Sequence, residues 1–235
     1  MTWFEHALDL VLFADDTNIF AQDKSPEELF ARVNRGLAGL DRWFRCNRLT
    51  LNLKKTEYVY FKGPGQGDPG LRLEVGKEGI RRVDGARFLG VWVDGGLKWG
   101  AQVERVRNRV AQLYGVLWRA GRVLGGRALL SLYNGLVLPH LQYCLMVWGG
   151  FREDGNGAAG GALLRLQKRF AGLVAGREGR YHSDPIFAEH GMLKVGDLYR
   201  QQLWVHAWRF WNGRLPGNQA AMLGRVSGAH DYGTR

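Results

Sequence analysis

Apolar and polar positions follow different patterns in the two parts of the chain. The first hundred residues carry short apolar runs separated by turn-forming residues, a pattern typical of short strands. Leu8–Ala21 (LDLVLFADDTNIFA) has two apolar arms around a polar centre. It predicts a β-hairpin whose turn holds Asp15, Asp16, Thr17 and Asn18.

A helix is predicted directly after this hairpin. Ser25 can cap it, Pro26 suits its first position, and Glu28 completes a capping box. Apolar residues then recur at steps of three and four, which places one apolar stripe on the helix. The stripe consists of Phe30, Val33, Leu37, Leu40 and Phe44.

Three further strands, one loop and one turn are predicted in the rest of the first hundred residues. Strand character returns at Leu49–Lys62, at Leu71–Val75, where apolar and polar residues alternate, and at Arg87–Val93. The glycine-rich and proline-rich segment Gly63–Gly70 is predicted to be a loop, and Asp94–Gly96 is predicted to be a turn.

From Trp99 onward the spacing of apolar residues becomes helical. The first predicted helix buries the stripe Val103, Val106, Val110, Leu113 and Leu117. Gly125 and Gly126 end it. A second helix follows, with apolar positions at Leu129, Leu132, Tyr133 and Leu136, and Pro139 is expected to stop or kink it.

The last part contains a predicted linker and two more helices. Gly155–Gly161 is expected to be a flexible connection, followed by helices at Ala162–Val174 and Leu198–Trp211. The last helix is rich in aromatic residues whose spacing favours helix core, although exposed rings there would be able to stack on nucleic-acid bases. These residues are Trp204, Trp208, Phe210 and Trp211. The fold class predicted for the whole chain is α+β, with a small, mostly antiparallel sheet followed by helices.

Charge narrows the classes of partner. The 235 residues include 33 Lys and Arg against 22 Asp and Glu, which gives a net charge of +11 and a pI near 10.0. Such an excess favours nucleic acid as partner, ahead of an anionic membrane, although a merely basic soluble protein has the same composition. No apolar run is long enough to span a membrane, and acidic residues interrupt the N-terminus where a signal peptide would be apolar. Two cysteines form no disulfide framework and have no zinc-site spacing, so we expect an intracellular protein, nuclear or cytoplasmic and not secreted.

Asp15 and Asp16 are the strongest candidates for chemistry. Two adjacent carboxylates on a hairpin repel each other, and a hard divalent cation such as Mg²⁺ relieves that repulsion with oxygen ligands. Two-metal nucleotidyl transfer requires such an arrangement. The alternative is structural, because aspartates favour turns for their own hydrogen-bonding reasons.

The segments around these aspartates resemble, in order, the reverse transcriptases of non-LTR retrotransposons. Leu12–Phe20 (LFADDTNIF) is similar to the family's metal-binding hairpin, and Trp43–Phe61 is similar to the helix, loop and strand that follow it. Arg87–Trp99 resembles the primer-grip hairpin, and Leu132–Gly149 resembles the thumb. His230–Arg235 (HDYGTR) is similar to the family's closing stretch.

The resemblance implies RNA-directed DNA polymerase activity and a role for several residues. Asp15 would be the main metal ligand with Asp16 beside it, and Lys55 would protonate the leaving pyrophosphate. The cofactor would be Mg²⁺ or Mn²⁺, and the partners would be an RNA template, a DNA primer or hybrid, and dNTP. The alternative for Lys55 is a solvated lysine at a strand end. The primer grip would hold Leu89, Gly90 and Val91, where a tight bend is the alternative.

Basic residues on the predicted helices are candidate phosphate contacts, and a solvated helix face is the alternative for each of them. The candidates are Arg105, Arg109, Arg119, Arg122, Arg127, Lys168 and Arg169.

The family's third catalytic aspartate and its fingers have no counterpart in these residues. We therefore expect a partial palm at 1–98, a helical thumb at 99–154 and a helical basic region at 155–235, inactive in isolation. An upstream polymerase half would be a partner, and the exposed palm strand Leu8–Phe13 would favour self-association. Two alternatives stay open. One is a non-catalytic nucleic-acid-binding module, and the other is a decayed product whose palm sheet pairs with another protein.

Overall fold

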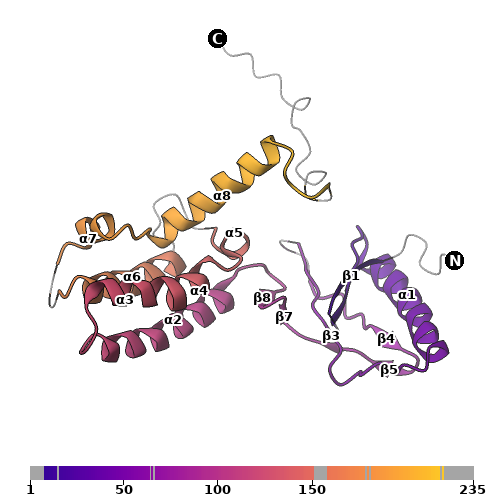
Figure 1. Cartoon of the computed structure of the whole chain (residues 1–235). Coiled ribbons are helices and arrows are strands. Elements are labelled where there is room, and N and C mark those ends of the chain that lie inside the picture. The colour runs from indigo at the N-terminus through magenta and orange to yellow at the C-terminus, as the bar shows by residue number, and fades with distance from the viewer. Residues whose placement is uncertain are drawn as a thin grey trace, which may run out of the picture. The chain divides into compact units, whose positions relative to one another are not determined.

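The computed structural model describes residues 8–219 except 15, 64, 66, 151–157, 178, 180 and 218. The chain divides into two compact units, unit 1 (Met1–Trp99) and unit 2 (Gly100–Arg235) (Figure 1). Helices combine with short antiparallel and parallel strand pairs, so the predicted α+β class is confirmed.

Unit 1 begins with the predicted hairpin. Strand β1 (Asp9–Phe13) pairs antiparallel with β2 (Asp16–Phe20), and Phe13 lies opposite Asp16. Only two residues therefore connect the strands, and the first of them, Ala14, has φ 52°. The hairpin is confirmed, but the position of its turn was wrong. Asp16 and the two residues after it continue the strand, because a two-residue connection with positive φ matches the twist of the paired strands.

The helix after the hairpin forms as predicted. Helix α1 (Pro26–Cys46) is capped by Ser25, whose hydroxyl oxygen accepts the backbone N–H of Glu28 at 3.3 Å. The carboxylate that contacts the cap is that of Glu27, which accepts the Ser25 hydroxyl at 2.7 Å, in place of the expected Glu28. Phe30, Leu37 and Leu40 of the predicted stripe are buried.

The remaining strands of unit 1 are short pairs. The expected single sheet is wrong: the described residues form four separate two-stranded sheets, three antiparallel and one parallel. Leu49–Lys62 contributes only two strand residues, because the Asn52 carbonyl accepts the N–H groups of Lys55 and Thr56 and closes a turn. The pairs are β3 (Glu57–Tyr58) with β6 (Arg81–Arg82), β4 (Glu74–Val75) with β5 (Glu78–Gly79), and β7 (Gly85–Phe88) with β8 (Val91–Asp94).

The core of unit 1 lies between α1 and these strands. The rings of Tyr58 and Tyr60 both lie against Phe30, with ring centroids 6.1 and 5.7 Å from its own. The buried members of the core are Phe30, Leu37, Leu73, Val75 and Ile80.

Unit 2 is helical, as predicted, and its first helix buries the whole predicted stripe. Helix α2 (Gly100–Ala120) ends before the glycine pair, and α3 (Gly126–Leu132) begins at the second glycine. The chain then passes through a π-helical turn (Tyr133–Val137) into α4 (Leu138–Gln142).

Pro139 distorts this second helix but does not end it. Proline has no N–H to donate, and the π turn shifts the register so that the N–H of Leu138 reaches the Tyr133 carbonyl five residues back. The shift also changes which residues are buried, so the predicted Leu136 is exposed. The buried row is instead every fourth residue, namely Leu129, Tyr133, Val137, Leu141 and Leu145.

The described part of unit 2 has four more helices, namely α5 (Leu145–Trp148), α6 (Ala158–Val174), α7 (Ser183–Glu189) and α8 (Val195–Trp211). The predicted linker Gly155–Gly161 lies partly outside the described residues, and its last four residues are the first turn of α6. The side-chain amide of buried Gln167 links α6 to the π-helical turn and to the start of α8. Its nitrogen donates to the Tyr133 hydroxyl (2.9 Å) and to the Leu193 carbonyl (3.1 Å). Its oxygen accepts the N–H of Val195 (2.6 Å). No helix in the described part of the chain is both long and apolar enough to cross a membrane.

Candidate functional site

The tip of the β1–β2 hairpin carries the candidate metal ligands. Asp15 lies outside the described residues. Asp16 opens β2 opposite Phe13, and its side chain is exposed. Within the described ranges, no group of three or more His, Cys, Asp or Glu side chains lies close enough together to hold a metal ion. The hairpin therefore presents one described carboxylate at its tip, next to Asp15 in the sequence.

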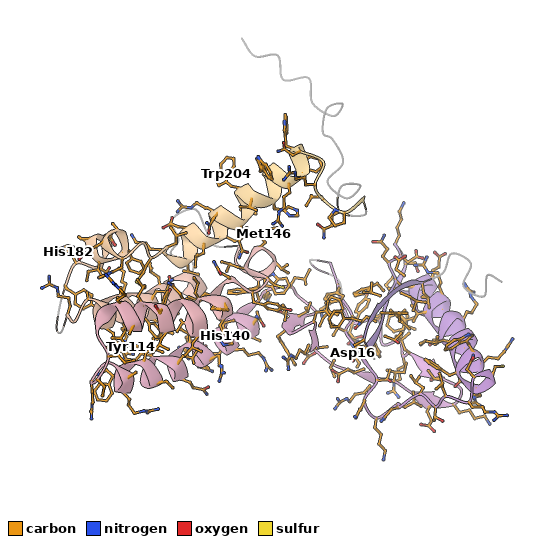
Figure 2. All side chains as sticks on the ribbon, viewed as in Figure 1. Asp16, Tyr114, His140, Met146, His182 and Trp204 are labelled. Atoms are coloured by element: carbon orange, nitrogen blue, oxygen red, sulfur yellow. The ribbon has the colours of Figure 1, made fainter. Side chains whose placement is uncertain are left out.

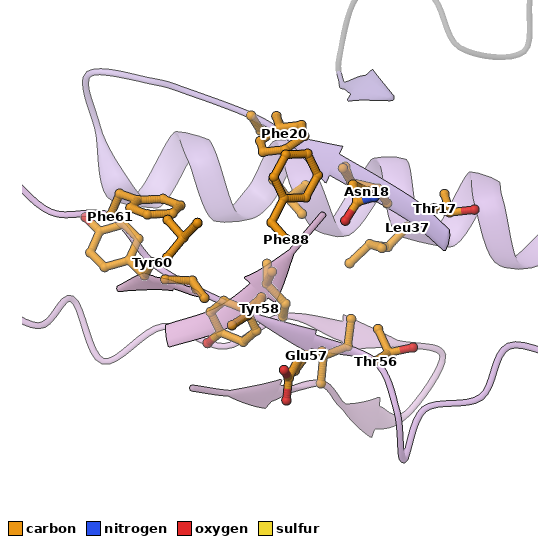
Figure 3. A pocket seen from close by; sticks show the side chains of 18 of the residues that line it. Thr17, Asn18, Phe20, Leu37, Thr56, Glu57, Tyr58, Tyr60, Phe61 and Phe88 are labelled. Carbon is orange, nitrogen blue, oxygen red and sulfur yellow. The ribbon is translucent and has the colours of Figure 1, made fainter. Parts of the chain in front are cut away.

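The segments that carry Asp16 and Lys55 border the same cavity. Their neighbours in sequence, Thr17 and Thr56, both line a cavity of about 320 Å³ beneath β2 (Figure 3). Lys55 itself is exposed in the turn that Asn52 closes. The cavity is mainly apolar, with Phe30, Leu37, Tyr58, Tyr60 and Phe88 among its lining residues. Residues of β2 thus form part of the wall of this cavity.

The candidate primer-grip residues occupy the turn between β7 and β8. Leu89 and Gly90 have φ values of 44° and 86°, which is the backbone of a two-residue hairpin turn with positive φ at both positions. The predicted strand Arg87–Val93 is wrong for this reason, since the chain reverses in its middle. Leu89 is 38% exposed, whereas Val91 is only 5% exposed. Leu89 and Gly90 are therefore accessible to a ligand, but the Val91 side chain is not.

The predicted turn after β8 is held by Asp94. Its carboxylate accepts the backbone N–H groups of Gly96 (3.0 Å), Lys98 (3.1 Å) and Trp99 (3.0 Å). Burial alone would raise the pKa of Asp94, but these three N–H donors outweigh burial and lower the pKa below its usual value. Leu97 and Trp99 have positive φ values in this segment, so the carboxylate stabilises an otherwise costly backbone at the end of unit 1.

Almost all of the net positive charge of the chain belongs to unit 2. Unit 2 contains 18 of the 33 Lys and Arg residues but only 8 of the 22 Asp and Glu residues, a net charge of +10. The other 15 basic and 14 acidic residues leave unit 1 at +1. A polyanionic partner is therefore attracted to unit 2.

Three of the predicted phosphate contacts share one face of α2. Arg105, Arg109 and Arg119 are all exposed. At about 100° per residue they lie within about 80° of one another around the helix axis, beside the buried stripe. We call these three residues the arginine face of α2.

The other predicted contacts lie just after α2, on α3 and on α6, and two of them are held over aromatic rings. The Arg122 guanidinium lies 4.4 Å from the Trp118 ring centroid, and that of Arg169 lies 4.1 Å from the Tyr114 ring centroid. Arg169 belongs to α6 and Tyr114 to α2, so this contact holds the Arg169 guanidinium against α2. Arg127 and Lys168 are also exposed.

Three of the four predicted aromatic residues of α8 contradict the prediction that they form helix core, and the fourth, Phe210, is half-buried. Trp204, Trp208 and Trp211 are exposed, because α8 is buried only through Val195 and Leu198 near its beginning. The sequence contains a signal that would have corrected the prediction. Polar residues, namely Gln202, His206 and Arg209, continue the face that Val195 and Leu198 begin, so that face cannot extend a core along the helix.

Comparison with known proteins gives a similarity to a protein of a retrotransposable element. The chain is 26% identical over 142 residues to a 115 kDa protein in the type-1 retrotransposable element R1DM of Drosophila melanogaster. The matched region is 59% of this chain and 14% of that protein, so the chain spans only a small part of its relative. No family model matches the chain. No solved structure matches it. The chain is therefore similar to a protein encoded by a retrotransposable element.

Proposed function

We propose that the chain is part of a reverse transcriptase of a non-LTR retrotransposon, and that unit 2 grips the backbone of its primer–template. The observation that carries this proposal is the charge of +10 on unit 2, together with the arginine face of α2. The similarity to a retrotransposon protein supports the class of partner.

The arginines are suited to phosphate by their geometry. A guanidinium presents several N–H donors in a fixed plane and binds phosphate oxygens through two of them. Stacking on Trp118 and Tyr114 limits the rotation of Arg122 and Arg169, so these two cations lose less entropy when they bind. Contacts of this kind position a duplex without reading its sequence.

The hairpin and the turn of Lys55 would form the palm side of the same enzyme. Asp16 and Asp15 offer carboxylate oxygens, which Mg²⁺ and Mn²⁺ accept as ligands, and the residues present fit part of such a site. The bound metal would stabilise charge on the transferred phosphoryl group. In this proposal a further polymerase segment, acting with this chain, supplies the remaining carboxylate, and Lys55 holds a proton near the nucleotide's phosphates.

A second candidate function is a non-catalytic nucleic-acid-binding module. It is favoured by the fact that the arginine face lies wholly in unit 2, which is compact by itself. A primer-extension assay with an added upstream polymerase segment distinguishes the two functions. The polymerase proposal expects Mg²⁺-dependent primer extension when the segment preceding the hairpin in a related element is supplied in trans, with loss of extension in Asp15→Ala and Asp16→Ala. The module expects binding and no extension.

Binding by unit 2 is tested with the whole chain and a labelled RNA–DNA hybrid. The triple variant Arg105→Ala, Arg109→Ala, Arg119→Ala should bind at least about tenfold more weakly, since each lost phosphate contact weakens binding to every sequence. The matched control removes the same charge from exposed positions of unit 1, namely Lys24→Ala, Arg35→Ala and Arg42→Ala. Equal loss of affinity in both triple variants would contradict a specific role of unit 2.

A further inference from the structure

Helix α8 presents three tryptophans on one exposed face. Trp204, Trp208 and Trp211 are 75%, 52% and 87% exposed. Their spacing of four and three residues places them within about 60° of one another around the helix axis. Figure 2 shows Trp204 on the outer side of α8, away from Met146. We call these three residues the tryptophan face.

The tryptophan face is separate from the contacts that hold α8 in unit 2. Val195 and Leu198 are buried on the opposite side of the helix, and the side-chain amide of Gln202 donates to the Gln142 carbonyl at 2.9 Å. In Figure 1 the C-terminal half of α8 extends beyond the other helices of unit 2. The three rings therefore contribute little to the core, and replacing them leaves the buried contacts of α8 intact.

Cations flank the tryptophan face at both ends. The Arg214 guanidinium lies over the Trp208 ring, 5.0 Å from its centroid. Arg200 lies one helical turn before Trp204, and its side chain is largely exposed although it approaches the Asp197 carboxylate at 3.5 Å. Exposed rings between cations, on a unit of charge +10, offer stacking surfaces and phosphate contacts together.

We propose that the tryptophan face binds single-stranded nucleic acid, with bases stacked on the three rings and phosphates bound by Arg200 and Arg214. The face extends over about 10 Å of helix, at 1.5 Å per residue. That length corresponds to about three nucleotides at about 3.4 Å each. Bases in a duplex are already stacked and paired, so only an unpaired strand offers the faces that these rings require.

Charge and chemistry favour this occupant over a second copy of the chain or a membrane. A second copy would bring the same excess of positive charge against the same cations. The three tryptophans have flat π surfaces and are 52–87% exposed, more than the neighbouring aliphatic residues Leu203 (39%) and Val205 (44%), so indole surface dominates this part of α8 and favours stacked bases over lipid tails.

This site is additional to the arginine face of α2 and does not depend on polymerase activity. The two sites are separable by substrate, since the arginine face is proposed to bind a duplex backbone and the tryptophan face to bind unpaired bases. Failure at one site therefore leaves the other proposal standing.

The test measures binding of the whole chain to labelled oligothymidylate, oligouridylate and a duplex of the same length. Changing all three tryptophans to alanine should weaken single-strand binding by about 10²-fold, the lower end of the stacking range for three rings. Duplex binding should change by less than about threefold, because phosphate contacts dominate it. Loss on both single strands indicates a face that tolerates either sugar, and loss on one of them identifies the preferred strand.

Two further variants separate stacking from simple apolar contact. Changing the three tryptophans to phenylalanine keeps the π surfaces and should restore most of the single-strand affinity. Changing them to leucine keeps apolar bulk and should not. Far-UV circular dichroism checks that each variant keeps its helices.

The proposal is overturned if the alanine variant binds single strands as tightly as the natural chain, or if the leucine variant does. It is also overturned if the alanine change leaves single-strand binding intact while abolishing self-association or binding to vesicles of anionic lipid. Those results would assign the face to a second copy or to a membrane.

Discussion

At the scale of single residues, Leu89 holds a backbone conformation that its side chain disfavours. Its φ of 44° lies in the left-handed region, which costs a residue with a branched side chain about 1–2 kcal/mol. Asparagine accepts this region more readily, and Asn-Gly is a preferred pair in such turns. Leu89→Asn should therefore raise the free energy of unfolding by about 0.5–1 kcal/mol in urea denaturation.

The control for Leu89 is Leu49→Asn, the same change at an exposed position of unit 1 where φ is not positive. It should be neutral or slightly destabilising. Equal stabilisation by both changes would mean that the benefit arises from removing exposed apolar surface. If Leu89→Asn also weakens hybrid binding, the strained leucine is retained for contact with nucleic acid.

Asp94 gives the stability of unit 1 a dependence on pH. Because its folded pKa is lowered, its contribution is present above the unfolded pKa near 3.9 and is lost as pH falls through the folded pKa. Asp94→Asn should cost about 1–2 kcal/mol at neutral pH, since the amide cannot accept all three N–H donors. Urea denaturation should show this difference shrinking below about pH 4, where Asp94 takes up a proton in the unfolded chain before it does so in the folded one. A difference that stays constant down to pH 3 would contradict the role of the charged carboxylate.

At the scale of elements, the β1–β2 hairpin leaves apolar surface and one strand edge uncovered within the described chain. Every residue of β1 is exposed, with Leu12 at 70% and Phe13 at 60%, and β1 pairs with β2 alone. Unpaired edges and bare apolar residues favour association. The whole chain should therefore form oligomers whose size in sedimentation velocity rises with concentration.

The substitutions Leu12→Lys and Phe13→Lys should return the chain to a monomer, because a lysine on an edge strand opposes pairing. The control places the same two lysines at exposed apolar positions of unit 2, Val123→Lys and Leu124→Lys. If the control disperses the oligomers equally well, added charge and not the hairpin edge governs association.

The same elements show what the sequence predicts well and what it does not. Helices α1 and α2 were predictable because each carries one apolar stripe, and α1 also has a cap residue. The end of α2 was not, since the helix stops at Ala120, before the predicted glycine pair Gly125 and Gly126. The turn positions were not, because which residues of Leu8–Ala21 or Arg87–Val93 reverse the chain depends on strand pairing, which a run of apolar letters does not reveal.

Tertiary contacts account for the other differences. The π turn before Pro139 moves the buried row from Leu136 to Val137, and the spacing of an ideal helix carries no sign of that shift. The tryptophans of α8 have core spacing but lie beyond the part of the helix that other elements cover. Of the candidate site, the exposure of the arginines was predictable from their places off the stripe. The burial of Val91 was not predictable, because it depends on the position of the turn at Leu89 and Gly90.

At the scale of the whole molecule, the two units differ in charge and in the role that we propose for them. Unit 1, at +1, carries the candidate palm residues Asp16 and Lys55, and unit 2, at +10, carries the candidate backbone contacts. In our proposal, the unit that carries the net charge binds the polyanion, and the other unit stays close to neutral. The tryptophan face adds a second type of contact to the charged unit.

Phosphate binding by unit 2 is best measured through the salt dependence of duplex binding, since each neutralised phosphate releases counterions. With about six contacts, the affinity of the natural chain for a DNA duplex should fall on the order of 10³-fold between about 50 and 200 mM salt. Changing Arg105, Arg109 and Arg119 to alanine should reduce the slope of log affinity against log salt by about three. An affinity that stays flat across this range, or a slope that the triple variant leaves unchanged, would contradict the account of unit 2 as a phosphate-binding surface.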